Sequence, residues 1–566
     1  MELDNHMIQV EVEGVGRRKI PLGTTLQELS KEIWPDTWRK ILAAYIDNEL
    51  RELTYPISQK SKIVFFGLEA KDGRRIYQRS ATFLLARAAK EILPGCRVAI
   101  KHSLSNGLYG EIHHTKAVGE RDLKAVEKRM GNIVQKDEIF EKLVMDIEEA
   151  RELFHRDNQP DKFNLLKYRK EDFINIYRVG WFHDYFYGYM VPSAGYLKHF
   201  RLKHYLPGFI LQIPDSITPD SIPPYKEQPK LASIHREAER WGDILEIGTV
   251  AALNDLITAG QGSDLISVAE ALHEKKLVQI ADQIFERKDA LRIILIAGPS
   301  SSGKTTFAQR LSIHMRVNGL KPVALHLDDY FLNRRDTPRN EQGEYDFESI
   351  KAIDLGLFNT HLALLIQGQE VEIPTFNFTS GTRQYTGKTL RVAKDQPIII
   401  EGIHGLNDLL TESIPSGNKF KIYISALTQL NLDDHNRIPT TDVRLLRRIV
   451  RDYQFRSNSP QTTLRRWRDV RQGERINIFP CQEEADVMFN SALCYELAVL
   501  KGYAEPLLNS VDKSEPGYSE AKRLLKFLNY FMPLVDDDIP AASILREFIG
   551  GSSFHTDVLE PEAATR

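Results

Sequence analysis

The nine residues from Gly298 to Thr306, GPSSSGKTT, constrain the fold of this chain more than any other stretch. An apolar run rich in branched residues, 291–297, precedes them and predicts a buried parallel strand. Residues 307–315 follow with apolar side chains at helical spacing, and Gly319 is placed to end that helix. A glycine-rich turn between a strand and a helix satisfies the complete phosphate-loop pattern. The sequence therefore predicts a doubly wound parallel sheet around a phosphate site.

Each residue type in this motif has a physical reason. Glycines let backbone N–H groups approach phosphate oxygens, and the helix N-terminus adds positive potential. We expect Lys304 to reach the β- and γ-phosphates and the Thr305 hydroxyl to ligate Mg²⁺. A glycine- and serine-rich turn with a chance lysine is the alternative, which the flanking strand and helix disfavour. The residues predicted to bind ATP in this motif are Gly298, Ser300, Ser301, Ser302, Gly303, Lys304, Thr305 and Thr306.

Length and composition set the wider limits. A chain of 566 residues exceeds what one hydrophobic core supports, so several domains are expected. A net charge of −3 gives no global argument for nucleic acid, although it leaves room for a local basic face. The three cysteines form no CxxC pair, which fits a reducing compartment. No apolar run is long enough to span a membrane, and the first residues lack a signal-peptide layout, so we expect a cytoplasmic protein without membrane contact.

Residues 1–67 show a small β-grasp pattern. An alternating strand at 8–13 and a short second strand lead to Gly23-Thr24-Thr25, which begins a helix over 26–33, and further strands are predicted at 43–47 and 62–66. This stretch, with its Asp47-Asn48 turn, resembles the TGS domain, a ubiquitin-like module of threonyl-tRNA synthetases and some GTPases. The resemblance implies a β-grasp fold and names no chemistry.

Residues 68–225 resemble the second additional domain of threonyl- and alanyl-tRNA synthetases, an α+β domain that hydrolyses mischarged tRNA. The resemblance is carried by residues 77–88, by Asn106 to Tyr109 and by residues 177–184. It implies that the editing histidines and cysteine of that family fall on Arg79, Phe83, Phe186 and Met190.

Those four side chains provide neither a zinc ligand set nor a general base, so the fold is expected to be kept and the hydrolysis lost. An editing hydrolase is therefore the disfavoured interpretation. Basic residues beside aromatic ones, at 167–170 and 201–205, could hold RNA or a tRNA end, and a solvated face is the simpler alternative.

A helical connector is predicted over 226–288, with helices at 232–245, 251–259 and 267–287. The phosphate-loop region, 289–500, follows it. A second strand, 322–327, ends at Asp328-Asp329, and the carboxyl end of a strand in a doubly wound sheet faces the ligand crevice. We therefore expect Asp328 to accept a proton from a hydroxyl, a turn or helix-cap role being the alternative.

Here the chain resembles the uridine kinase and phosphoribulokinase branch of P-loop kinases. The resemblance places the catalytic base on Asp328, an acidic substrate contact on Glu348 and the Pro-x-Tyr-Asp-Phe signature on residues 374–383. A buried strand ending at Glu401 gives that carboxylate, with Thr305, the role of holding Mg²⁺. The predicted catalytic residues are Asp328, Lys304 and Arg448, and the predicted substrate contacts are Asp328, Tyr330, Glu348, Phe376, Asn377 and Arg383.

The family's lid falls on residues 442–452. Its arginines Arg444, Arg447, Arg448 and Arg451 have the spacing that places them on one helix face. Four like charges on one face repel one another unless an anion lies against them, and bound triphosphate supplies that anion. Arg444, Arg448 and Arg451 are therefore predicted to contact ATP. A solvated basic face is the alternative.

The departures from the family limit the substrate prediction. The positions that read the pyrimidine base are Phe376 and Gly381 here, and the adjacent aspartate is Asn377, so uridine or cytidine would lose hydrogen-bond partners. We predict an ATP- and Mg²⁺-dependent phosphotransferase acting on a hydroxyl of a nucleoside or related small metabolite. The alternatives are a kinase of a non-nucleoside acceptor and an RNA- or tRNA-binding regulatory protein with a nucleotide switch.

The last region, 501–566, is predicted to form helices at 518–532 and 542–549 that pack on the phosphate-loop domain. A polar tail, expected to be disordered, follows over 557–566. The predicted fold class is thus a multidomain α/β protein with a β-grasp domain, an α+β domain and a doubly wound parallel-sheet domain. An oligomer is compatible with this organisation.

Overall fold

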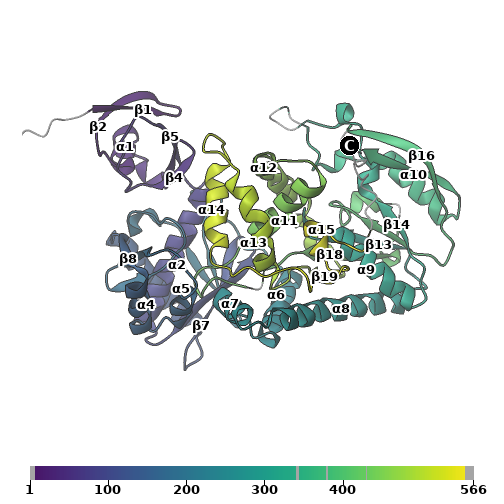
Figure 1. Ribbon diagram of the computed structural model, residues 1–566, viewed down its shortest axis with the longest axis horizontal. Helices are drawn as coiled ribbons and strands as arrows, with labels where there is room; N and C mark the ends of the chain where they lie inside the picture. Colours follow the sequence, from purple (N-terminus) through teal and green to yellow (C-terminus); the bar gives the residue numbers. More distant parts are fainter. Residues whose placement is uncertain are drawn as a thin grey trace, which may run out of the picture.

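The computed structural model describes residues 7–339, 343, 345–377, 380–412, 414–428 and 430–554. It is elongated, with the N-terminal sheet at the upper left of Figure 1 and the parallel sheet of the phosphate-loop motif at the right. The described residues contain no helix that is both long enough and apolar enough to cross a membrane.

The first sheet has the strand order β2-β1-β5-β3-β4. Its β1 and β5 run parallel, while the other neighbouring strands run antiparallel, which is the predicted β-grasp arrangement. Thr25 begins α1 (Leu26–Ile33) with a capping box to Glu28, and the helix has the predicted bounds. The strands are β1 (Met7–Val12), β2 (Gly16–Pro21), β3 (Ala43–Ile46), β4 (Glu49–Glu52) and β5 (Lys62–Phe66).

The second region is built on the long helix α2 (Lys71–Ile92), most of which is buried. One sheet has the order β11-β12-β7-β6 and another the order β10-β9-β8. A single hydrophobic cluster runs from Val10 of the first sheet to Ile213 of the second region, so the two regions share a core. The remaining elements are β6 (Arg97–Leu104), β7 (Gly107–His113), α3 (Glu120–Gln135), β8 (Glu141–Asp146), α4 (Ile147–Arg156), α5 (Pro160–Leu166), β9 (Phe173–Val179), β10 (Phe182–Asp184), β11 (Arg201–Tyr205) and β12 (Gly208–Gln212).

Three helices connect this half to the parallel sheet: α6 (Pro229–Ile244), α7 (Val250–Thr258) and α8 (Gly262–Glu286). They match the predicted helices to within a few residues, and α8 begins earlier than predicted. Gly260, in the turn between α7 and α8, has φ +75°, which only glycine adopts readily. The helix α8 runs along the lower edge of the molecule in Figure 1.

The parallel sheet has the order β14-β17-β13-β18-β19, and every neighbouring pair in it is parallel. Alternate residues of β13 enter two different hydrophobic clusters: Ile294 and Ile296 on one face, Ile293 and Leu295 on the other. Both faces are therefore covered, as a doubly wound sheet requires. Its strands are β13 (Ile293–Ala297), β14 (Val323–His326), β17 (Ile398–Glu401), β18 (Lys419–Ser425) and β19 (Val487–Asn490).

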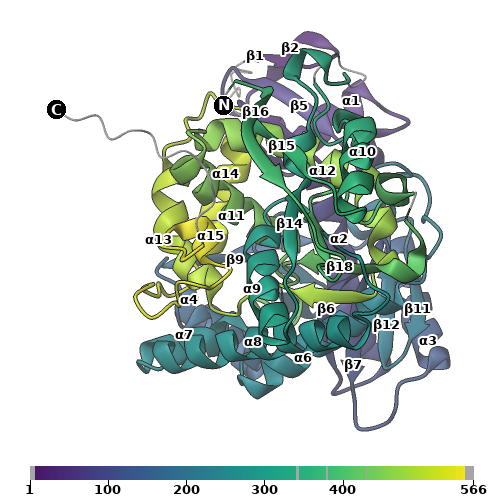
Figure 2. The same ribbon diagram turned by 90° about the vertical axis from the view of Figure 1, so that its right-hand side faces the viewer.

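Helices and a hairpin surround this sheet. In Figure 2 its helix α9 faces the viewer above α8, and the antiparallel hairpin of β15 and β16 stands beside α10. The elements are α9 (Lys304–Val317), α10 (Leu355–Ile366), β15 (Val371–Asn377), β16 (Thr382–Leu390), α11 (Thr440–Phe455), α12 (Pro460–Asn477) and α13 (Glu496–Asn509).

The C-terminal helices are shorter than predicted, at Tyr518–Leu528 for α14 and Arg546–Ile549 for α15. The prediction that both pack on the phosphate-loop domain was incomplete. The helix α14 also binds the N-terminal half: its Glu520 pairs with Arg75 of α2 at 2.8 Å, and its Lys522 pairs with Glu49 of β4.

Two buried ionic clusters join the halves of the chain. Lys162 of α5 is fully buried, with its Nζ 3.1 Å from Asp184 Oδ1 and 3.4 Å from Asp433 Oδ1. Asp442, in the first turn of α11, pairs with Arg75 at 3.3 Å and with Arg523 of α14 at 2.7 Å. Because charges this deeply buried must stay paired, the two clusters fix the N-terminal half against the parallel sheet.

Candidate functional site

The phosphate-loop motif forms a tight turn between β13 and α9, as predicted. Ser301 and Gly303 lie in the left-handed region, with φ of 59° and 83°. A Cβ on Gly298 would lie 2.1 Å from the carbonyl oxygen of Ile424, so this position has room only for glycine. The structure thus brings all eight residues of the motif that were predicted to bind ATP into one turn at the start of α9.

Thr305 and Glu401 meet at the carboxyl edge of the sheet. The Thr305 hydroxyl donates a hydrogen bond of 3.0 Å to Glu401 Oε1, and His326 Nδ1 lies 3.3 Å from the same oxygen. Burial alone would raise the pKa of Glu401, but the bond and charge of His326 outweigh it and lower that pKa. A hydroxyl beside an ionised carboxylate is an oxygen donor set that fits Mg²⁺. The neighbouring His326 was not singled out from the sequence.

Asp328 follows β14 in the short 3₁₀ helix Leu327–Tyr330, one strand away from Glu401. The residue as a whole is exposed, while its carboxylate has charged neighbours in Glu401, Lys304 and Arg456. Desolvation, and then the charge of Glu401, raise its pKa, while Lys304 and Arg456 act in the opposite direction. A carboxylate with a raised pKa at the mouth of a phosphate site is suited to accept a proton.

Glu348 lies between α12 and the carboxyl edge of the parallel sheet. A Cβ on Gly473 would come within 2.2 Å of Glu348 Cβ. Asn477 Nδ2 donates a hydrogen bond of 2.9 Å to the Glu348 carbonyl oxygen. Burial raises the pKa of Glu348 to about 7, with the charge of Arg448 opposing and that of Glu474 reinforcing the shift. Glu348 thus titrates near neutrality beside the predicted phosphate site.

This shift predicts how stability depends on pH. Since the native state holds the Glu348 proton to a higher pH than the unfolded chain does, stability falls as pH rises from about 4.5 to about 7. Replacing Glu348 with glutamine removes that loss. The thermal unfolding midpoint of the variant, relative to wild type, is expected to be higher at about pH 8 than at about pH 5. An equal difference at both pH values would contradict the assignment.

Residues 293–498 match the Phosphoribulokinase / Uridine kinase family. This stretch, which is less than half of the chain, is therefore similar to the kinases of this family, and it is called the kinase domain below. A possible uridine kinase from Bacillus stearothermophilus is similar at 20% identity over 37% of this chain and 100% of that one, with a TM-score of 0.24. Because that score is low, the fold of the kinase domain is assigned from its own strand order and loop geometry.

The N-terminal half matches threonine–tRNA ligases. The ligase of Ralstonia nicotianae is 32% identical over 197 residues, which cover 35% of this chain and 31% of the ligase. That of Anaplasma marginale (strain St. Maries) is 31% identical over 179 residues, or 31% of this chain and 28% of the ligase. The chain thus spans less than one third of the length of these relatives.

The contacts of the arginines of α11 contradict the prediction that these charges need a bound anion. Carboxylates already balance their charge. Arg444 pairs with Glu474 of α12 at 2.5 Å, Arg447 pairs with Glu496 of α13 at 2.6 Å, and Arg451 pairs with Asp452 of α11 itself at 2.7 Å. The inference that four like charges require a bound anion was therefore wrong. Arg444 and Arg447 are also almost completely buried.

Arg448 has a different environment from the other three. Its Nη1 donates a hydrogen bond of 2.7 Å to the Ser300 hydroxyl, while its Nε lies 3.2 Å from Asp452 Oδ2. It therefore faces the phosphate loop directly, whereas Arg444 and Arg447 reach the loop through the carbonyl oxygens of Ser300 and Ser301. Of the predicted lid residues, Arg448 has the geometry best suited to a phosphate.

The structure places the predicted substrate contacts in different surroundings. Tyr330 is fully buried, and its hydroxyl lies 3.1 Å from His361 Nδ1, so the prediction that it contacts substrate was wrong. Phe376 packs against Phe331 with 7% of its surface exposed, and Arg383 Nη1 pairs with Asp354 at 3.0 Å. Asn377 ends β15, with its Oδ1 accepting from the Ser380 N–H. The predicted signature also includes residues 378 and 379, which lie outside the described residues.

The positions of the lost editing ligands lie in a packed interior. The rings of Phe83 and Phe186 are 6.3 Å apart, and Met190 Sδ accepts a 3.7 Å bond from the Ser80 hydroxyl. Arg79 donates 3.0 Å to the Tyr189 carbonyl oxygen. Apolar side chains and a backbone contact thus occupy the four positions at which the family resemblance placed catalytic and zinc-binding groups.

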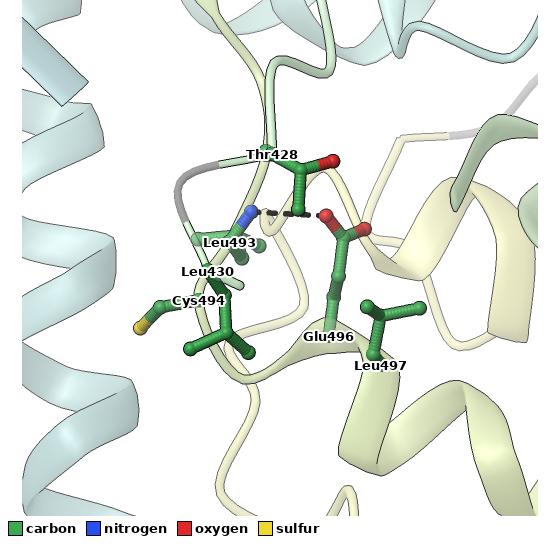
Figure 3. Close-up of a pocket in the computed structure, with 7 residues that line it drawn as sticks. Thr428, Leu430, Leu493, Cys494, Glu496 and Leu497 are labelled. Atoms are coloured by element: carbon green, nitrogen blue, oxygen red, sulfur yellow. Dashed lines mark hydrogen bonds between the residues drawn. The ribbon is translucent and has the colours of Figure 1, made fainter. Parts of the chain in front are cut away.

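A small pocket lies past the carboxyl ends of β18 and β19 (Figure 3). In it, the Leu493 N–H donates 3.2 Å to Glu496 Oε1, and the other carboxylate oxygen of Glu496 is held by Arg447. Burial raises the pKa of the Cys494 thiol to about 12, so the thiol stays protonated. The pocket is lined by Thr428, Leu430, Ala492, Leu493, Cys494, Glu496 and Leu497, and its one charged group is already paired.

Two carboxylates at the loop were missed by sequence reasoning. Glu474 Oε1 accepts a 3.1 Å bond from the Ser300 N–H, and Glu547 Oε2 accepts a 3.2 Å bond from the Thr306 N–H. Both residues follow the motif by more than a hundred positions, and neither belongs to a recognisable pattern. Only the fold places them beside the loop.

Proposed function

We propose that this protein is an ATP-dependent phosphotransferase that acts on a hydroxyl of a nucleoside or related small metabolite. The observation that supports it most is the meeting of three groups at one sheet edge: Lys304 at the start of α9, Glu401 hydrogen-bonded to Thr305, and Asp328 in the 3₁₀ helix after β14. Phosphoryl transfer needs a phosphate cradle, a cation site and a hydroxyl-orienting carboxylate within reach of one another.

Each residue has a role in this proposal. The loop N–H groups and Lys304 hold the β- and γ-phosphates, and Asp328 orients the acceptor hydroxyl and takes its proton. Thr305 and Glu401 would hold Mg²⁺, which neutralises charge on the phosphates when bound. Arg448, which touches Ser300, contributes positive charge where negative charge develops on the transferring group.

The acceptor is proposed to lie between Asp328 and the hairpin of β15 and β16. Phe376, Asn377 and Arg383 of that hairpin, with Glu348, would line its site. Asp329 of the loop after β14 accepts a 3.3 Å bond from the Phe376 N–H, which couples the hairpin to the catalytic loop. A nucleoside-like acceptor follows from the family, and Gly381 in place of a base-reading side chain widens the range to other small hydroxyl compounds.

We further propose the domain division 1–67, 68–225, 226–288, 289–500 and 501–566, with the first domain TGS-like. The separate sheets at 7–66 and 97–212 and the connector helices support it. The three free cysteines support a cytoplasmic location.

The deciding experiment incubates the full chain with ATP, Mg²⁺ and a panel of nucleosides and small hydroxyl metabolites. Mass spectrometry is expected to detect a new monophosphate that is absent with Lys304→Ala. Lys321→Ala is the matched control, because this exposed lysine precedes β14 at the opposite edge of the sheet. A product formed equally by wild type and Lys304→Ala would refute the proposal.

RNA binding with a nucleotide switch is the second candidate, favoured by the similarity of the N-terminal half to threonine–tRNA ligases. It predicts that tRNA changes ATP affinity while no small product forms. Phosphorylated product with no effect of tRNA on ATP affinity would exclude the switch.

A further inference from the structure

The C-terminal segment, residues 536–549, lies directly on the phosphate loop. Ile544 is fully buried, and a Cβ on Gly303 would come within 2.4 Å of its Cγ2. This segment lies beyond the stretch that matches the kinase family, which ends at residue 498. The kinase family match therefore gives this contact no role.

The contact includes a charged group at the start of α9. Glu547 Oε2 accepts a hydrogen bond of 3.2 Å from the Thr306 backbone N–H and another of 2.9 Å from the Thr306 hydroxyl. Thr306 is the third residue of α9, so its N–H is one of the first four that have no partner within the helix. Such N–H groups, at the end of a phosphate loop, are the donors that phosphate oxygens use.

Glu547 is held in this place by its neighbours. Arg546 pairs with Asp536 at 2.6 Å, and Ser543 Oγ donates 2.5 Å to Glu270 Oε1. Phe548 is fully buried, with the guanidinium of Arg447 4.9 Å from its ring centre. The backbone around Glu547 is thus anchored, and its side chain is the part that can move away from Thr306.

The two carboxylates at the loop differ in one respect. Glu474 is fully buried and bonded through both oxygens to Arg444, so its charge is balanced whether or not a nucleotide is bound. Within the described part of the chain, Glu547 has no ion-pair partner, and it is only partly buried. Its negative charge therefore acts on whatever approaches the Thr306 N–H.

We propose that the Glu547 carboxylate is an internal competitor for nucleotide phosphate, so that the C-terminal segment sets how tightly the loop holds its nucleotide. This inference rests on the proposed function. A phosphate oxygen and the carboxylate cannot both accept from the Thr306 N–H, and two anions at that spacing repel each other. Nucleotide binding therefore has to displace the Glu547 side chain. The competing interpretation is that Glu547 only caps α9.

The test compares ATP, ADP and adenosine binding to the full chain by titration calorimetry. Glu547→Gln keeps an oxygen that accepts from Thr306 but removes the charge. The Kd of ATP and ADP is expected to fall about 5- to 10-fold, while the Kd of adenosine stays unchanged because it carries no phosphate. Glu547→Ala is expected to show the same tightening. The control Glu286→Gln, at the exposed end of α8, is expected to leave every Kd unchanged.

The outcomes separate the alternatives. Equal ATP affinity in wild type and Glu547→Gln, with a lower unfolding midpoint for Glu547→Ala, would overturn the inference in favour of a helix cap. ATP that binds neither wild type nor the variants would refute the proposed function together with this inference. Tightening that is as large for adenosine as for ATP would also refute it, because the competition is for phosphate.

Discussion

Replacing Asp328 with asparagine is expected to lower kcat about 10²- to 10⁴-fold while leaving the Kd of ATP unchanged. The amide has the shape of the carboxylate but cannot take the proton of the acceptor hydroxyl. The phosphate loop is untouched by this change, because Lys304 and Thr305 make their contacts elsewhere, with Pro299 and Glu401. Steady-state kinetics with the identified acceptor, together with ATP titration, measure the two quantities separately.

Asp329→Asn is the matched control for this variant. Asp329 neighbours Asp328 in sequence, but its Oδ1 accepts from the Phe376 N–H, a bond that an amide oxygen can also accept. The control is therefore expected to retain most of its kcat. Unchanged turnover in Asp328→Asn would remove Asp328 from the role of base, and an equal loss in both variants would indicate a general effect of charge on the loop.

Replacing Lys162 with methionine is expected to lower the free energy of unfolding by about 3–5 kcal/mol. Burial alone would lower the pKa of Lys162, but Asp161, Asp184 and Asp433 outweigh it and raise that pKa well above its ordinary range. Methionine fills the same volume and leaves the three carboxylates without their common cation. Urea unfolding at neutral pH, followed by circular dichroism, measures the loss.

Lys167→Met is the control, because Lys167 is about half exposed and its pair with Asp255 at 2.7 Å lies in solvent. A pair of this kind is screened by solvent and contributes little to stability, so its loss is expected to leave the free energy of unfolding nearly unchanged. Asp161 offers a further check: although burial opposes it, Lys162 and then His435 lower the pKa of Asp161 to about 2. Its stabilising contribution is present above about pH 4 and is lost as pH falls toward 2, and Lys162→Met is expected to weaken this acid dependence. A Lys162→Met protein as stable as Lys167→Met would contradict the role of the cluster.

Sequence reasoning succeeded where chemistry is local. The loop from Gly298 to Thr306 needs its own glycines. Asp328 directly follows an apolar run and Glu401 ends another, so the positions of these residues follow from a few neighbours in sequence. The predicted helix over 26–33 has its cap at Thr25 for the same reason. Patterns of this kind predicted the β-grasp arrangement and the parallel sheet.

Sequence reasoning failed where the residues that contact a side chain are distant from it in sequence. The charges of Arg444 and Arg447 are balanced by Glu474 and Glu496, which no spacing rule connects to α11. Tyr330 was expected at the substrate, yet it follows a strand end so closely that its ring enters the core beside His361. In the same way, the clusters around Lys162 and Asp442 join segments from both halves, so neither half alone shows why those charges are buried.

The fixed position of α11 has a consequence for how the site closes around its ligands. Swinging this helix as a rigid body would separate Asp442 from Arg75 and Arg523, and Arg447 from Glu496, and breaking a single buried pair of this kind costs about 3–5 kcal/mol. Ligand-induced motion is therefore expected in the hairpin of β15 and β16, because its second strand is mostly exposed and, among the strands that the structure describes, forms a ladder only with β15. Because the N-terminal half shares the pairs that hold α11, we expect it to stay in place while that hairpin moves.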